Sequence, residues 1–210
     1  MKNYLAVYPI KTNIRSTLKK YSPTLLLFLV FVGGIVFGAI NSGSADKQLC
    51  SRLDFLLRTN YDIKTTYAFF YPFISSLASL TVFIFAELLL GTSPWGGVLC
   101  IALPFFRGYG YGLAGGFLYS SFGAYGFFYN VLIILPGVLF GAMIIISATK
   151  ESMKNSFSIL FLFRKNSVDD DRYIKMKNYL RSMLIYLALC AVCAIVDSLM
   201  SFCFSWIFRF

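Results

Sequence analysis

Long apolar stretches separated by shorter polar segments set the pattern of this chain. A helix needs roughly 20 apolar residues, at about 1.5 Å each, to cross the hydrocarbon core of a bilayer. Five stretches meet this requirement, so we expect an all-α, polytopic transmembrane bundle in which residues 1–210 form a single integral membrane domain. The expected spans cover residues 23–40, 67–90, 95–120, 122–148 and 183–208.

Two polar segments between the spans are long enough to have structure of their own. In residues 41–66, leucines recur at i, i+4, i+7 and i+8, which predicts an external amphipathic helix. Such a helix lies on the membrane, caps the bundle or docks a partner, and we favour the first of these. Residues 149–178 are basic, with an apolar run and an acidic triplet, and predict an interfacial helix followed by a solvated turn. The leucines of the first segment, which are candidates for docking a partner, are Leu49, Leu53, Leu56 and Leu57.

Composition supports the membrane interpretation and removes several functions. The chain is 58% hydrophobic and 13% charged, with a mean hydropathy of +0.72, which is too apolar for an ordinary soluble domain. It contains no histidine, so Ser-His-Asp and Cys-His catalytic groups and the common histidine-containing zinc sites are absent. Cys190 and Cys193 form a C-x-x-C among apolar residues, where a packing role is expected. We therefore expect neither an enzyme nor a bound metal or other cofactor.

The excess of positive charge indicates how the chain is oriented. The formal net charge is +10, which in so apolar a chain fits topology and contact with anionic lipid better than nucleic-acid binding. Five Lys and Arg residues precede the first span and eight lie between the fourth and fifth, whereas the opposite side holds five. Because positively charged loops stay in the cytoplasm, the N-terminus is predicted inside and the C-terminus outside. The basic segment of residues 149–178 is then internal.

Three ionisable side chains fall inside predicted spans, where each is costly and therefore a candidate functional residue. Arg107 lies about 18 Å and Asp197 about 21 Å from the start of its span, counted at about 1.5 Å per residue. Because an unpaired charge at this depth is expensive, we predict that Arg107 pairs with Asp197, in either a fixed structural or a gating role. Glu87 is closer to the cytoplasmic end of its span, so a solvated role at the interface competes with a transport role.

Glycines and prolines recur at positions that affect how the spans pack. Glycines four residues apart share one helix face and let a neighbouring backbone approach closely, which predicts a tightly packed bundle or a homo-oligomer. Pro104 is expected to kink or break its helix near the middle, and Pro136 lies inside the next span. Discontinuous helices of this kind also occur at transporter sites. The glycines with this spacing are Gly34 and Gly38, then Gly108, Gly112 and Gly116, and finally Gly137 and Gly141.

The residues around Arg107 resemble a known family. The stretch FFRGYGYGLAGGFLY, residues 105–119, is followed by LPG at residues 135–137 and by IIISATKES at residues 144–152. Together with the chain length, the basic leader and the five spans, these stretches resemble the stage II sporulation protein M family of Gram-positive spore-formers. The resemblance implies a non-enzymatic scaffold in the septal membrane that works with a pair of peptidoglycan-cutting proteins to drive engulfment of the forespore.

Two functions from different classes remain. In the first, implied by the resemblance, the protein is a scaffold in the bacterial cell membrane, septal or forespore-facing. Its partners are then membrane lipid and the peptidoglycan hydrolases of the engulfment machinery. In the second, it is a small transporter or the membrane subunit of a permease, with Arg107 and Asp197 at its site. Intramembrane catalysis is disfavoured, because Glu87 and Asp197 are predicted at different depths.

Overall fold

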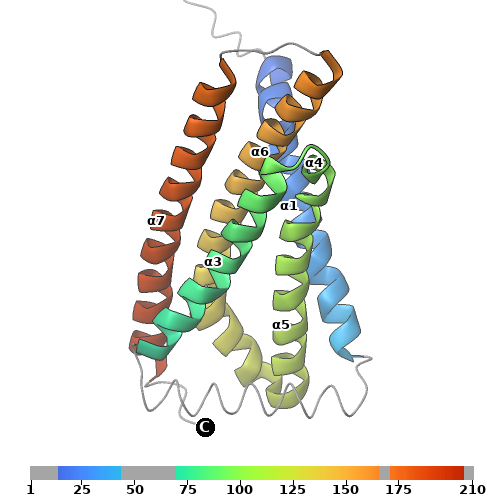
Figure 1. Ribbon diagram of the computed structural model, residues 1–210. Coiled ribbons are helices and arrows are strands. Elements are labelled where there is room, and N and C mark those ends of the chain that lie inside the picture. Colours follow the sequence, from blue (N-terminus) through green and yellow to red (C-terminus); the bar gives the residue numbers. More distant parts are fainter. Residues whose placement is uncertain (1–13, 44–69, 166–170, 206–210) are drawn as a thin grey trace, which may run out of the picture.

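The computed structural model describes residues 14–43, 70–165 and 171–205, and the side chains of residues 21–42, 70, 72–161 and 176–203. Within these ranges the chain is almost entirely helical and contains no strand, so the all-α prediction is confirmed. Figure 1 shows the long helices gathered into one bundle. In chain order the elements are α1 (Ile14–Gly43), α3 (Phe70–Thr92), the short α4 (Gly96–Leu99), α5 (Ala102–Tyr129), the π-helix η1 (Asn130–Ile134), α6 (Leu135–Lys165) and α7 (Asp171–Ser205).

Four apolar stretches of the described chain are long enough to cross a membrane. One of them, Gly96–Phe161, has 66 residues and would be about 100 Å long as a straight helix. Instead it folds back, and α5 and α6 run in opposite directions from a shared end of the bundle (Figure 1). The reversal includes Gly123, whose φ of 57° and ψ of −133° suit glycine. The other three stretches are Tyr21–Ser42, Pro72–Thr92 and Met176–Cys203.

Pro104 interrupts the helix, but not near the middle as predicted. It lies in the first turn of α5, and the irregularity precedes it at Cys100 and Ile101, between α4 and α5. Proline has no N–H to donate to the carbonyl four residues earlier. The amide of Leu103 donates to the Cys100 carbonyl instead, at 3.2 Å, in a tighter turn. The kink therefore marks the beginning of α5.

Pro136 has a similar effect at the beginning of α6. The five residues of η1, Asn130–Ile134, form a π-helical turn immediately before it, and the Leu135 amide donates to the Asn130 carbonyl. A wider turn accommodates the missing proline donor. The two irregular stretches lie toward opposite ends of the α5–α6 pair (Figure 1).

Residues 149–178, predicted as an internal segment with an interfacial helix and a solvated turn, instead largely extend the bundle helices α6 and α7. Residues 149–165 continue α6, and α7 begins at Asp171. The correction has a physical cause: the polar side chains Thr149, Ser152 and Ser156 are fully buried against other helices rather than solvated. Of the predicted external segment, residues 41–43 complete α1, and the candidate docking residues Leu49, Leu53, Leu56 and Leu57 lie outside the described residues.

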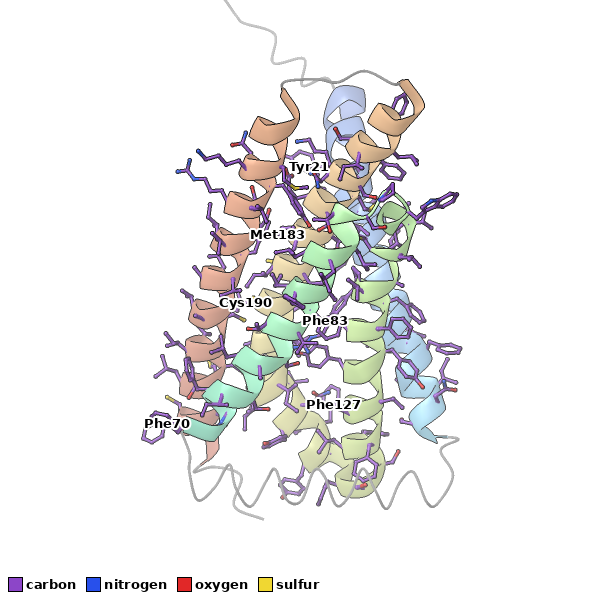
Figure 2. The ribbon with its side chains drawn as sticks, in the orientation of Figure 1. Tyr21, Phe70, Phe83, Phe127, Met183 and Cys190 are labelled. Carbon is purple, nitrogen blue, oxygen red and sulfur yellow. The ribbon has the colours of Figure 1, made fainter. Side chains whose placement is uncertain are left out.

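The helices form two groups. α1 packs along α5, whereas α3, α6 and α7 pack on one another, and α6 also contacts α1. Figure 2 places Met183 and Cys190 on the side of α7 that faces α3 and α6, where they belong to the buried core of that group. Large apolar side chains such as Leu29, Val82 and Leu184 stay exposed on the outside of the bundle, as expected where helices face lipid.

The predicted glycine faces of α1 and α5 meet each other. A Cβ on Gly34 would overlap the Phe105 carbonyl oxygen, and one on Gly112 would overlap the Ile35 carbonyl oxygen. Because these neighbours are backbone atoms, only glycine permits this approach. The faces predicted to serve a tight bundle or a homo-oligomer are thus used within one chain. Gly38, Gly108 and Gly116 take part in the same contact, Gly137 faces Asp197 of α7, and Gly141 faces Leu80 of α3.

Candidate functional site

Two groups of polar side chains lie inside the bundle, and both are anchored on α3. The Arg107 cluster consists of Ser76 and Ser79 of α3, Arg107 and Tyr111 of α5, and Asp197 of α7. The Glu87 cluster consists of Glu87 of α3, Thr149 and Ser152 of α6, and Tyr179 of α7. Glu87 follows Ser79 by eight residues, so the two clusters are separated by about 12 Å along α3.

Arg107 reaches from α5 to α3. Its Nη1 donates to Ser79 Oγ, and its Nη2 donates to Tyr111 Oη at 2.8 Å. The guanidinium carbon lies 5.2 Å from the centre of the Phe83 ring and 4.8 Å from that of Tyr111. Figure 2 shows Phe83 in the space between α3 and α5. Contact with aromatic faces stabilises a desolvated cation, but the third donor group, Nε, is buried without a partner.

Asp197 does not pair with Arg107. Its Oδ2 accepts a hydrogen bond from Ser76, and a Cβ on Gly137 of α6 would overlap its carboxylate. No ion pair joins Arg107 to Asp197, although the structure describes both side chains. The predicted direct pair is therefore wrong. The reason is that α3 places two serines one turn apart at this level. Ser76 bonds Asp197, and Ser79 bonds Arg107.

The side chains of the Arg107 cluster suit the binding of a small polar group and not of a metal ion. One guanidinium, one carboxylate and three hydroxyl groups can hold a small polar group by hydrogen bonds. The described part of the chain contains no group of three His, Cys, Asp or Glu side chains that could hold a metal ion. The cluster can also act purely as structure, because it ties α3, α5 and α7 together through side chains.

Glu87 is fully buried, with 0% of its surface exposed. Its Oε1 accepts a hydrogen bond from Thr149, while Oε2 has no hydrogen-bond partner. Ser152 and Cys100 lie beside the carboxyl group. The predicted solvated role at the interface is wrong, because α6 and α7 continue past this level of α3 as helices and cover it (Figure 1).

Tyr179 joins the Glu87 cluster to the end of α3. Its hydroxyl donates to the Glu87 carbonyl at 3.1 Å and lies 3.2 Å from Ser152 Oγ. The Glu87 carbonyl lies inside α3, where the amide four residues later is its helical donor, so the bond from Tyr179 is an additional contact that ties α7 to α3. A Cβ on Gly91 would overlap the Tyr179 hydroxyl, which makes glycine necessary where α7 approaches α3.

Two further side chains of α6 hold the turn after α3. Asn155 Nδ2 donates to the Gly91 carbonyl at 2.9 Å. Ser156 Oγ donates to the Ser93 carbonyl at 2.7 Å and accepts from the Gly97 amide at 2.7 Å. These bonds satisfy backbone groups that the turn into α4 leaves without helical partners. α6 therefore fixes the path of the chain between α3 and α5.

The α6 residues of these contacts, and Tyr179, were not among the candidate residues predicted from the sequence. A signal for them exists, because Thr149, Ser152 and Ser156 are spaced i, i+3 and i+7 and so share one helix face. Because residues 149–178 were predicted to lie outside the bundle, these hydroxyl groups were not expected to face other helices. Tyr179 has no comparable local signal.

Comparison with known proteins finds no relative on which to base a function: no family model matches the chain, and neither a curated protein nor a solved structure matches it.

Proposed function

We propose that the protein is a non-enzymatic membrane scaffold that holds peptidoglycan-remodelling hydrolases at the septal membrane during forespore engulfment. The observation that carries the proposal is the glycine contact between α1 and α5. It uses Gly108, Gly112 and Gly116, which belong to the stretch that resembles the sporulation family. A backbone-to-backbone contact fixes two helices rigidly, as a platform for partner proteins requires.

The proposed topology has five spans, with the N-terminus inside and the C-terminus outside. In Figure 1 the beginnings of α1, α5 and α7 lie at the same end of the bundle as the ends of α3 and α6. The same end carries exposed Lys150, Lys154, Lys177 and Arg181. Positive charge near helix ends favours the cytoplasmic side. Trp95, which is 79% exposed in the turn before α4, supports this topology, because tryptophan prefers the membrane interface.

The proposal assigns different partners to the two sides of the membrane. The basic end contacts anionic lipid headgroups by charge attraction. The external segment of residues 41–66, with Leu49, Leu53, Leu56 and Leu57, is the expected contact for the hydrolases. Polar replacement of these leucines is then expected to release the hydrolases without unfolding the bundle.

Deletion of the gene in its native host tests the proposal, which requires that this host forms spores. We expect engulfment to stop at the flat septum, as seen by fluorescence microscopy of the membranes. A Gly33→Leu chain should restore engulfment, because a Cβ on Gly33 meets nothing within 4 Å. A Gly34→Leu chain should not, because its side chain would push α1 away from α5. Normal engulfment in the deletion strain would contradict the scaffold proposal.

A transporter is the second candidate, and one observation favours it. Arg107 Nε is buried without a partner in a cluster that joins three helices, so a polar ligand could supply the missing acceptor. Against this, the irregular stretches before Pro104 and Pro136 lie toward opposite ends of the bundle, whereas the broken helices of transporters meet near the midplane. An Arg107→Met chain that accumulates normally should support engulfment in a scaffold and lose function in a transporter.

A further inference from the structure

The scaffold proposal leaves Glu87 without a role, although its position is costly. The carboxyl group is 0% exposed and Oε2 has no hydrogen-bond partner. The one hydrogen bond to Oε1 comes from a neutral hydroxyl, that of Thr149. A neutral hydroxyl does not compensate an ionised carboxylate for the loss of water.

No positively charged side chain among the described residues reaches Glu87. The groups that face it are Thr149 and Ser152 from α6, Cys100 from the α4–α5 junction, and Tyr179, whose hydroxyl bonds the Glu87 carbonyl. The acidic residue nearest to them on α6, Glu151, forms its ion pair with Lys154 at 3.8 Å. The remaining basic residues of α6 and α7 near this level, all exposed, are Lys150, Lys177 and Arg181.

The backbone of α3 contributes one oxygen to the cluster. The Glu87 carbonyl lies inside α3, whose last residue is Thr92, and accepts a further hydrogen bond from Tyr179 at 3.1 Å.

We propose that Glu87, with Thr149, Ser152 and Tyr179, forms a site for one monovalent cation, a proton or a sodium ion, that neutralises the buried carboxylate. Carboxylate, hydroxyl and carbonyl oxygens are the ligands that hard cations prefer. A single carboxylate balances a single positive charge. A divalent ion would need further acidic ligands, and the described residues offer no group of three metal-binding side chains.

The two cations compete for the same carboxyl group. Thr149 has one hydroxyl hydrogen and lies within hydrogen-bond distance of both Oε1 and the Ile145 carbonyl, the latter at 2.9 Å. A proton on Oε1 is donated to Thr149, whose own hydrogen then goes to Ile145. A sodium ion instead contacts the deprotonated carboxylate as an ionic ligand, and Thr149 then donates to Oε1. The site is independent of the scaffold proposal, because it involves neither the glycine contact nor the external segment.

Infrared difference spectroscopy of the full-length protein in liposomes tests the site. The samples are the wild type, Glu87→Gln, and the control Glu151→Gln, which removes a carboxyl group that is not fully buried. In sodium-free choline chloride at neutral pH, we expect a protonated carboxylic acid band in the wild type and in Glu151→Gln that is absent from Glu87→Gln. Replacing choline with sodium then separates the cations. Loss of the band identifies a sodium site, and an unchanged band identifies a proton site.

A second measurement needs no variant. Hydrophobic carbodiimides react with protonated carboxyl groups, so dicyclohexylcarbodiimide should modify Glu87 in the wild-type protein in sodium-free buffer, as read by peptide mass spectrometry. Sodium chloride should slow this labelling if sodium is the ligand, whereas potassium chloride should not. The proposal is overturned if the acid band of Glu87 is absent in sodium-free buffer and Glu87 remains unmodified.

Discussion

Alanine at Gly34 is predicted to destabilise the bundle, whereas alanine at its neighbour Gly33 is not. A Cβ on Gly34 would overlap the Phe105 carbonyl oxygen and lie 3.0 Å from the Tyr109 amide nitrogen. A Cβ on Gly33 meets nothing within 4 Å, and Gly33 is exposed. The two positions share a helix and differ only in the face they present.

The expected magnitude follows from this difference. Both variants gain helix propensity, worth up to about 1 kcal/mol. Because that gain is common to both, the difference between them is the cost of forcing a methyl group against backbone, about 1–3 kcal/mol. For a chain of this size, 1 kcal/mol shifts the melting temperature by about 2–4 °C. We therefore expect Gly34→Ala to melt about 5 °C below Gly33→Ala.

Thermal unfolding in one detergent, followed by circular dichroism, measures this difference directly. The same comparison can be made on α5, where Gly112 contacts α1 and Gly110 meets nothing within 4 Å. Gly112→Ala should again be the less stable of the two. Equal melting temperatures within both pairs would refute the inference that α1 and α5 are joined through their glycines.

Three further changes probe the polar contacts. Arg107→Lys should cost about 1–3 kcal/mol in thermal unfolding, because an ammonium group cannot donate in a planar fork to two hydroxyls while lying over an aromatic ring. Tyr179→Phe should cost about 1–3 kcal/mol by removing the hydroxyl that bonds the Glu87 carbonyl and the buried Ser152, whereas Tyr125→Phe, at a position 71% exposed, should leave the melting temperature unchanged. Ser156→Ala should speed proteolysis in the turn between α3 and α4, and Ser147→Ala, at an exposed site, should not. An unchanged melting temperature in Arg107→Lys or Tyr179→Phe, or unchanged proteolysis in Ser156→Ala, would contradict the contact assigned to that residue.

The apolar spans could be predicted from sequence because a bilayer imposes a local requirement on each of them. A run of about 20 apolar residues is sufficient evidence for a helix of spanning length, whatever the helix packs against. The reversal near Gly123 falls close to the boundary predicted between spans 95–120 and 122–148. Polar residues at the ends of the spans were misassigned, because hydropathy does not show whether a polar helix is buried by other helices. Thr149, Ser152 and Ser156 lie on such a buried helix, although hydropathy placed them in a segment outside the bilayer.

The bonding partners in the two polar clusters could not be predicted, because one sequence does not show which helices lie side by side. Counting residues gave Arg107 and Asp197 similar depths, but depth says nothing about which helix lies between them. α3 supplies Ser76 and Ser79 at that level, so each charge is bonded separately. Glu87 was misplaced because its burial depends on how far α6 and α7 continue as helices. The glycine faces could be predicted as packing surfaces, but their pairing within one chain could not.

Thiol crosslinking in the native membrane tests the scaffold function most directly. Cys50 belongs to the predicted external segment, and Cys50→Ser provides the matched control. A membrane-impermeant thiol crosslinker, followed by mass spectrometry of the captured proteins, should recover a peptidoglycan amidase or lytic transglycosylase with the wild type and not with the variant. Recovery of only a second copy of this chain, or copurification of an ATPase subunit in place of a hydrolase, would contradict the scaffold and favour the transporter.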